Sequence, residues 1–220
     1  MRIAAISDIH GDFQSLTTVW SDIETRGLNK GPVLNAGDTV AYGHSTMACI
    51  DFVRDERRNI VSVAGNYDIN AARFPAREES FRRKWARLRP EKFLALKDAS
   101  ADLSANAREW LLALPTSTIV DVEDARLSIS HYAPTTEKEG LFADTAETRL
   151  AEIAAQIDRR YDVVIVGHTH SPFVRRVGSV LFVNPGAVGR SFGTPTYAEL
   201  EFGPNTEPVA RIILCRVSHQ

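Results

Sequence analysis

The chain has 220 residues, of which 44% are hydrophobic and 25% are charged, and its formal net charge is −2. This length is enough to bury one large core, and the balanced charge gives no overall attraction for nucleic acids or anionic membranes. No apolar run approaches the ~18 residues of a membrane-spanning helix, and the first residues lack the features of a signal peptide. We therefore expect a cytoplasmic protein whose partners are neither membranes nor nucleic acids. Its two cysteines, Cys49 and Cys215, are far apart and are predicted to stay reduced.

The first half of the chain repeats the order strand, loop, helix. Short apolar runs predict buried strands over residues 3–7, 32–36 and 60–64. Apolar residues at helical spacing predict a helix from Phe13 to Gly27 and another over 46–55. This alternation is typical of right-handed βαβ units around a parallel sheet.

The pattern changes after Asp68, which we expect to fix its loop or orient a neighbouring His. Residues 73–92 contain eight basic and three acidic residues, and the basic ones are Arg73, Arg77, Arg82, Arg83, Lys84, Arg87, Arg89 and Lys92. Apolar residues at helical spacing predict a small helical insertion over about 70–100 that covers the site, within a single domain of residues 1–220. The basic residues either steer an anionic substrate or form the solvated face of a helix, and the second reading is favoured. A further helix is expected after the N-cap Ser104 and is stopped by Pro115.

The second half returns to strands. A hairpin is predicted over 118–130, a helix over 145–159 and a buried strand over 161–166. The tail is predicted to form further strands, over 174–177, 180–183, 197–202 and 209–217. Their short Gly and Pro turns predict an antiparallel sheet packed on the first sheet. The expected fold is α/β, with two sheets face to face and helices outside.

Seven side chains that can bind a metal ion lie just after predicted strands: Asp8, His10, Asp38, Asn66, His131, His168 and His170. Taken singly, each has an ordinary explanation as a helix cap, a turn residue or a surface group. Four of the six His and three Asp or Asn in equivalent positions instead indicate one shared site. Mixed carboxylate, imidazole and amide ligands suit Mn, Fe, Zn, Ni or Co better than Ca or Mg. Seven ligands suit two ions with a bridging carboxylate. Two ions about 3.5–4 Å apart stabilise both oxygens of a phosphoryl displacement, with a bridging hydroxide as the nucleophile.

Five sequence blocks, in order along the chain, resemble the calcineurin-like metallophosphoesterases: Asp8-x-His10, Gly37-Asp38-x-x-x-x-Gly43, Gly65-Asn66, His131 and Gly167-His168-x-His170. The tail segment 184–189 is similar to the YfcE-like phosphodiesterase branch. The resemblance implies two facing mixed sheets flanked by helices, and a centre of two divalent transition-metal ions for which Mn is favoured. It implies two ligand sets that share Asp38 as the bridge. One is Asp8, His10, Asp38 and His170, and the other is Asp38, Asn66, His131 and His168.

The chain departs from most of the superfamily at Tyr67, where relatives have a His that protonates the leaving oxygen or holds the phosphate. A phenol, with a reference pKa of about 10, donates a hydrogen bond but is a poor proton donor at neutral pH. Asn66 and Tyr67 are expected to contact the substrate during catalysis, next to Asp38. His44 is a candidate for the missing acid, although an ordinary loop His is the favoured alternative. Arg190 is a candidate for a phosphate contact, with a plain surface Arg as an equal alternative.

The resemblance and the missing His together predict a phosphodiesterase acting on small or cyclic nucleotide-type diesters. The alternatives are a broad phosphomonoesterase or protein phosphatase, a nuclease, and a metal-binding scaffold of the retromer-subunit type. The complete set of seven ligands argues against the scaffold. The physiological substrate and the oligomeric state are not determined at this level.

Overall fold

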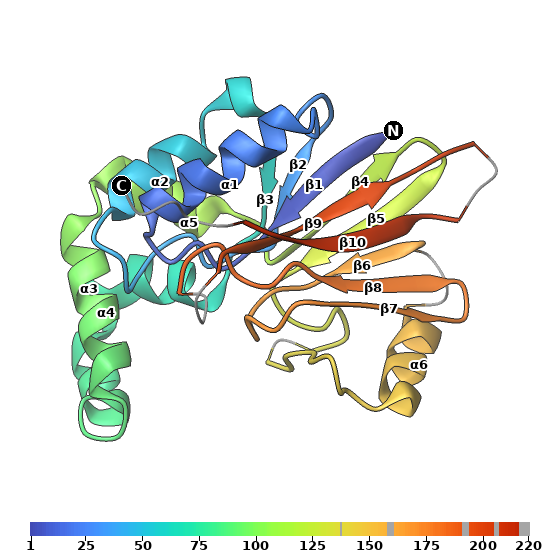
Figure 1. The fold of residues 1–220 in the computed structure, drawn as a ribbon. Helices are drawn as coiled ribbons and strands as arrows, with labels where there is room; N and C mark the ends of the chain where they lie inside the picture. The colour runs from blue at the N-terminus through green and yellow to red at the C-terminus, as the bar shows by residue number, and fades with distance from the viewer. Residues whose placement is uncertain (137, 158–160, 191–193, 205–206, 216–220) are drawn as a thin grey trace.

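Two five-stranded sheets lie face to face in the computed structural model, which describes residues 1–136, 138–157, 161–190, 194–204 and 207–215 (Figure 1). The strand order of the first sheet is β10-β9-β1-β2-β3. Its strands are β1 (Arg2–Ile6), β2 (Val33–Asn35), β3 (Ile60–Ser62), β9 (Thr196–Glu201) and β10 (Val209–Leu214). β1, β2 and β3 are parallel, whereas β9 and β10 are antiparallel to their neighbours. The three parallel strands that the sequence predicts are therefore present, and two antiparallel strands extend the sheet beyond β1.

The second sheet has the order β4-β5-β6-β8-β7. Its strands are β4 (Ser117–Val122), β5 (Ala125–Ser130), β6 (Val163–Ile165), β7 (Phe173–Val177) and β8 (Val180–Asn184). β5, β6 and β8 run parallel, and β4 and β7 are antiparallel strands at the edges. The tight pairing of Val122 with Ala125 confirms the predicted hairpin. Both sheets are mixed, as expected for the fold.

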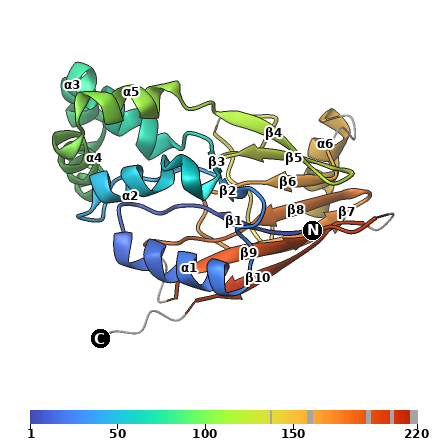
Figure 2. The ribbon, with the colours of Figure 1, turned by 90° about the horizontal axis from the view of Figure 1, so that it is seen from above.

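Apolar side chains from both sheets form the central core, where Ile3 and Leu34 of the first sheet meet Ile129 and Ile165 of the second. The helices α1 (Phe13–Thr25) and α2 (Thr46–Val53) cover the other face of the first sheet, and α6 (Glu147–Gln156) covers the second. The remaining α-helices are α3 (Asn66–Trp85), α4 (Pro90–Asp102) and α5 (Ala105–Ala113). They gather at one end of the molecule and pack on each other (Figure 2). Within the described part of the chain, no helix is long and apolar enough to cross a membrane.

The prediction of a separate antiparallel sheet in the tail is wrong, because the tail strands divide between the two sheets. β7 and β8 join the second sheet, with Val163 opposite Leu181, and β9 and β10 join the first, with Ile3 opposite Leu200. The reason is burial on both faces. All five residues of β8 and the first five of β9 are buried, so these strands belong inside a sheet with both faces covered. The ends of two predicted elements, residues 158–159 and 216–217, lie outside the described residues.

The start of the helical segment also differs from the prediction, which placed the helical insertion from about residue 70. Here α3 begins at Asn66. The Asp68 carboxylate accepts a hydrogen bond from the backbone N–H of Gly65, 2.9 Å away, which starts the helix earlier. As predicted, Ser104 caps α5, with its Oγ accepting a hydrogen bond from the N–H of Ala107. That residues 70–100 act as a cap over the site stays a prediction.

Candidate metal centre

The sequence-predicted ligands come from five strand ends that meet at one side of the molecule. Asp8 and His10 follow β1, Asp38 follows β2, and Asn66 follows β3 and begins α3. From the second sheet, His131 follows β5, and His168 and His170 follow β6. The carboxyl ends of parallel strands meet at one edge of a sheet, so loops distant in sequence lie together. The two facing sheets thus bring these loops into one place.

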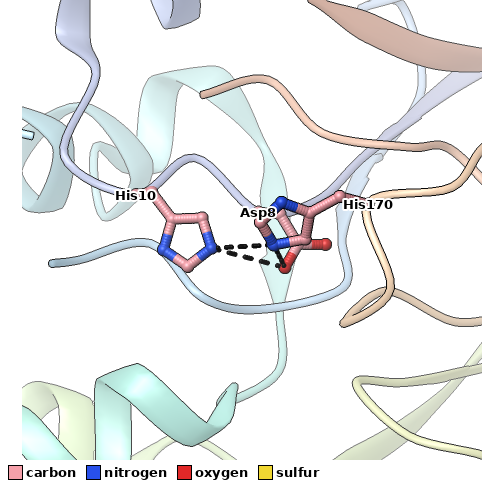
Figure 3. Close-up of side chains that lie close together, drawn as sticks. All are labelled: Asp8, His10 and His170. Atoms are coloured by element: carbon pink, nitrogen blue, oxygen red, sulfur yellow. Dashed lines mark hydrogen bonds and ion pairs between the residues drawn. The ribbon is translucent and has the colours of Figure 1, made fainter. Parts of the chain in front are cut away.

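A first group consists of Asp8, His10 and His170 (Figure 3). Asp8 Oδ1 lies 3.2 Å from His170 Nε2 and 3.7 Å from His10 Nε2. The two Nε2 atoms are 3.0 Å apart. All three atoms point to one position, which is the arrangement that a shared cation requires.

A second group consists of Asp38, His131 and His168. His131 Nε2 lies 3.2 Å from Asp38 Oδ2 and 3.3 Å from His168 Nδ1. Two contacts connect the groups. Asp38 Oδ2 is also 3.9 Å from His10 Nε2, and the backbone N–H of His168 donates to Asp8 Oδ2 at 3.0 Å. Asp38 Oδ2 is therefore within reach of both groups, which is the position expected for a bridging oxygen.

The backbone around the site is strained. Five of the seven candidate ligands have a positive φ, which is sterically unfavourable for residues other than Gly: Asp8 (54°), His10 (51°), Asp38 (57°), His168 (72°) and His170 (56°). Each such residue costs roughly 1–3 kcal/mol and persists only where the surrounding structure imposes it. Backbone strain concentrated at these residues indicates that the fold holds their side chains in place for a function.

The donor chemistry fits metal ions. Asp8, His10, Asp38 and His131 are each at most 1% exposed. Asp8 Oδ1 accepts no hydrogen bond from any described residue, although Ser7 Oγ and His168 N donate to its Oδ2. A buried carboxylate oxygen without a donor is costly. A cation between the facing oxygen and nitrogen atoms removes that cost, so the residues present fit two bound ions.

The backbone holds the imidazoles of His131 and His10 with their Nε2 atoms toward the site. His131 Nδ1 lies 2.8 Å from the carbonyl oxygen of Ala36, and His10 Nδ1 lies 3.3 Å from that of Val40. A carbonyl oxygen can only accept a hydrogen bond, so both Nδ1 atoms are donors and carry hydrogen. Such carbonyl partners orient metal-binding imidazoles in general. The Nε2 atoms are thus presented to the two groups.

The protonation of the metal-free site is set by burial and by the two carboxylates. Burial by itself lowers the pKa of His131, but Asp38 outweighs it and raises this pKa to about 9. Burial and the charge on His131 lower the pKa of His168 to about 4. Burial also lowers the pKa of His10. Without metal, a proton on His131 therefore provides the positive charge beside Asp38.

Asn66 and Tyr67 lie at the start of α3, against the second group. The backbone N–H of Tyr67 donates to Asp38 Oδ1 at 2.7 Å, and Asn66 Oδ1 accepts from the hydroxyl of Tyr132 at 2.9 Å. Asn66 Nδ2 has no hydrogen-bond partner among the described residues. The Tyr67 ring meets the His10 ring edge-on at 5.2 Å, and its hydroxyl is hydrogen-bonded to that of Tyr42. Burial and this bond raise the pKa of Tyr67 well above its usual value, so its phenol stays protonated.

His44 and Arg190 lie close to Tyr42, at a second cavity. Both line a cavity of about 430 Å³ that also contacts His10. The guanidinium of Arg190 lies 3.6 Å from the centre of the Tyr42 ring, and both His44 and Arg190 are exposed. The structure therefore places them near the first group, at its solvent side, and their predicted catalytic and phosphate-binding roles stay predictions.

Three side chains next to the ligands were missed or not singled out from sequence. Tyr132 bonds Asn66, and Tyr42 bonds Tyr67. Lys92 Nζ lies 4.8 Å from the centre of the Tyr67 ring. Only position in the chain could have indicated Tyr132, which directly follows His131. Nothing local could have connected Lys92 with Tyr67, because packing of α4 on α3 brings them together.

Comparison with known proteins places the chain in one family and shows structures that share its fold. The family model of the calcineurin-like phosphoesterase superfamily domain matches residues 1–203. An uncharacterised protein of Methanocaldococcus jannaschii, MJ0912, is 27% identical over 205 residues, which cover 86% of this chain and 76% of that protein. The crystal structure of the hypothetical protein PH1004 from Pyrococcus horikoshii superposes with a TM-score of 0.83 at 18% identity and covers 97% of this chain and 87% of that one.

Two more distant structures share the fold and have described activities. An archaeal phosphodiesterase superposes with a TM-score of 0.57 at 22% identity, covering 97% of this chain and 99% of its own. The phosphoesterase YfcE of E. coli superposes with a TM-score of 0.53 at 18% identity, covering 91% of this chain and 88% of its own. The family model confirms the resemblance to the calcineurin-like phosphoesterases that the sequence motifs indicated.

Proposed function

The chain belongs to the calcineurin-like phosphoesterase superfamily, and on that basis we propose that it is a phosphodiesterase that hydrolyses small or cyclic nucleotide-type diesters with two divalent metal ions. One observation carries this proposal. Two groups, each of one Asp and two His, lie side by side, and Asp38 Oδ2 is within 4 Å of an imidazole of each. Two-metal centres of this kind catalyse in-line phosphoryl displacement.

In this proposal Asp8, His10 and His170 hold one ion, His131, His168 and Asn66 hold the other, and Asp38 is shared. When bound, the two ions supply a nucleophile from water at neutral pH and Lewis acidity at the attacking and leaving oxygens. The mixture of carboxylate, imidazole and amide favours a transition metal such as Mn²⁺ over Ca²⁺ or Mg²⁺. The chain contributes the orientation of these ligands and the burial of Asp8, His10, Asp38 and His131.

Tyr67 supports the preference for diesters. Its phenol keeps its proton, because burial and the bond with Tyr42 raise its pKa. It is therefore suited to donate a hydrogen bond to a phosphate oxygen, and unsuited to transfer a proton to a leaving group. A neutral donor also matches the single charge of a phosphodiester better than the double charge of a monoester. Both effects disfavour monoesters with poor leaving groups.

The test compares initial rates on bis(p-nitrophenyl) phosphate and p-nitrophenyl phosphate in Mn²⁺. We expect the wild type to prefer the diester. Asp38→Ala should reduce the rate to below about 1%, since even outer-shell partners of metal ligands cost 10–100-fold when removed. Asp98→Ala, at an exposed position of α4, is the matched control. Tyr67→His should raise the monoester rate, by at most the roughly 10²–10⁴-fold that general acid catalysis contributes.

Other outcomes have definite meanings. If the wild type prefers the monoester, another group supplies the proton, and a His44→Gln variant tests the first candidate. If the wild type binds Mn²⁺ but hydrolyses neither ester, the proposed function is wrong and a scaffold role takes its place.

A further inference from the structure

A large cavity lies directly beside the candidate metal centre. It has a volume of about 770 Å³ and lies between α3 and α4 on one side and the segments before β4 and after β5 on the other. Asn66, His131 and His168 are part of its wall, so the cavity opens onto the second metal-binding group. Its size is in the range of pockets that bind small ligands, about 300–1,000 Å³.

The cavity is strongly cationic. Five basic side chains line it: Arg73, Arg77, Lys84, Lys92 and Lys138. None of its described lining residues is an Asp or Glu, and none of the five cations forms an ion pair with an acid in the described part of the chain. Arg82 of the same helix, which does not line the cavity, pairs instead with Glu78 and Glu79. Positive side chains that line a concave site without neighbouring acids raise the local concentration of anions.

The cations continue directly from the metal centre along one face of α3. Asn66, Asn70, Arg73 and Arg77 all line the cavity, and they follow one another at intervals of four, three and four residues. Residues with this spacing lie on one face of a helix. At 1.5 Å per residue, Arg73 and Arg77 begin about 10 Å and 16 Å along the axis from Asn66. Their long side chains are thus placed to contact a ligand that extends out of the metal centre.

Lys92 stands where the cavity meets the site. Its Nζ lies 4.8 Å from the centre of the Tyr67 ring and 4.7 Å from that of Trp85. The Trp85 ring is in turn stacked on Phe81, with centres 4.7 Å apart and planes inclined at 28°. The ammonium group is therefore held between two rings, one of which belongs to the residue expected to contact the substrate. A cation fixed in this way is positioned for an anionic group next to the reacting phosphate.

We infer that this cavity binds a second phosphate group of the substrate, so that the substrate class is a small nucleotide-type phosphodiester that carries at least one further phosphate. The inference rests on the proposed function, because it places the reacting diester at the metal centre. A small ligand is favoured over a long nucleic acid strand, since the basic residues gather around one cavity of about 770 Å³ while the chain as a whole has a net charge of −2. The reacting diester carries one negative charge at the metal centre. The five cavity cations match the further negative charges of the second phosphate.

The test uses two chromogenic esters that differ only in the second phosphate. They are the 5′-p-nitrophenyl ester of thymidine 5′-phosphate and the same ester with a 3′-phosphate. We expect the wild type to have a kcat/KM at least about tenfold higher for the bisphosphate ester, chiefly through a lower KM, because each charge-assisted contact to the second phosphate adds binding energy.

The variant Arg73→Gln with Arg77→Gln removes two cavity cations. The matched control is Arg83→Gln with Arg87→Gln, which removes two exposed cations of neighbouring positions that do not line the cavity. We expect the cavity variant to reduce the ratio of the two kcat/KM values at least about fivefold and the control to leave the ratio as in the wild type. Equal ratios in both variants would overturn the inference, since a general charge effect would then explain the preference.

Binding of thymidine 3′,5′-bisphosphate and thymidine 5′-monophosphate, measured by calorimetry in Mn²⁺, separates the two proposals. If the simple ester is hydrolysed but the second phosphate changes neither kcat/KM nor binding, the inference is wrong while the proposed function stands. If neither ester is hydrolysed but the bisphosphate binds more tightly through Arg73 and Arg77, the proposed function fails and the phosphate site stands. Faster cleavage of a single-stranded oligonucleotide than of the bisphosphate ester would overturn the assignment to small substrates.

Discussion

The carboxylate of Asp68 holds the loop that carries Asp38, because its Oδ2 accepts a hydrogen bond from the backbone N–H of Asp38 at 2.9 Å. The same Oδ2 accepts from the N–H of Gly65, and Oδ1 accepts from those of Thr39 and Val40. One fully buried side chain thus binds four backbone donors of two loops. It fixes the turn in which Asp38 has a positive φ.

Asp68→Asn should weaken both the fold and the metal centre. An amide can place only its oxygen toward the N–H groups, so two of the four donors lose their acceptor. At about 1–3 kcal/mol for each unsatisfied buried group, we expect the free energy of unfolding to fall by about 2–6 kcal/mol. Metal affinity should fall roughly 10–100-fold, as for other residues that support ligands. Urea unfolding of the metal-free protein and calorimetric Mn²⁺ titration measure the two effects.

The exposed Asp98 on α4 provides the control for that experiment, since Asp98→Asn changes the same chemical group at the surface. It should change the unfolding free energy by less than about 0.5 kcal/mol. Wild-type stability and affinity in Asp68→Asn would contradict the role assigned to the four hydrogen bonds.

Gly65 has no room for a side chain beside Asp38. A Cβ at this position would lie 2.1 Å from Asp38 Oδ1 and 2.3 Å from its backbone N. Gly65→Ala must therefore displace the shared carboxylate, and we expect Mn²⁺ affinity and diesterase activity to fall at least about tenfold. Gly178→Ala in the β7–β8 turn has nothing within 4 Å of the added Cβ. It should lose only the roughly 1–2 kcal/mol of its left-handed φ and keep normal metal binding, and equal effects of the two variants on binding would refute the steric explanation.

Metal binding should depend on pH through His131. In the folded, metal-free protein the neighbouring Asp38 outweighs burial and raises the pKa of His131 from 6.5 to about 9, so the imidazole is protonated at neutral pH. A metal ion requires the neutral imidazole and must displace this proton. Affinity for Mn²⁺ should therefore rise with pH by up to about tenfold per unit and level off above about pH 9.

Calorimetry at pH 7.5 in two buffers with different ionisation enthalpies counts the protons released. We expect at least about one per protein, and about one fewer in His131→Gln. Because the folded pKa is the higher one, the same group stabilises the metal-free protein fully below about pH 6.5 and loses this contribution as pH rises toward 9. Mn²⁺ binding without proton release would show that His131 is neutral in the free protein.

The two cysteines should be unreactive in the native protein. Cys49 is completely buried and Cys215 is 5% exposed, and burial raises the pKa of each thiol to about 12. At pH 8 only about 10⁻⁴ of each would be thiolate, which is the reactive form. A thiol reagent such as dithionitrobenzoate should modify neither group in hours and both at once in denaturant. Rapid modification of one thiol under native conditions would show that its segment opens locally.

The elements and the convergence of the ligand loops were accessible from sequence for a physical reason. Buried strands are short apolar runs, and the carboxyl ends of parallel strands necessarily lie at a common edge. It follows that Asp8, Asp38 and Asn66, which end three successive strands, come together whatever the details of packing. The path of the tail was not accessible, because apolar strands such as β8 and β9 fit equally well into either sheet by local pattern. Only pairing with β6 and β1 decides between them.

The sequence by itself determined the kind of side chains at the site and the strand ends that carry them, because periodicity and spacing are local properties of the chain. The tertiary structure alone decided the distances from Asp38 to an imidazole of each group, the bond between Tyr42 and Tyr67, and the place of Lys92 between Tyr67 and Trp85. These relationships join residues 7 to 93 positions apart in the chain, and most of them depend on how whole helices and sheets pack. Packing is a property of the complete set of buried surfaces, and no local pattern encodes it.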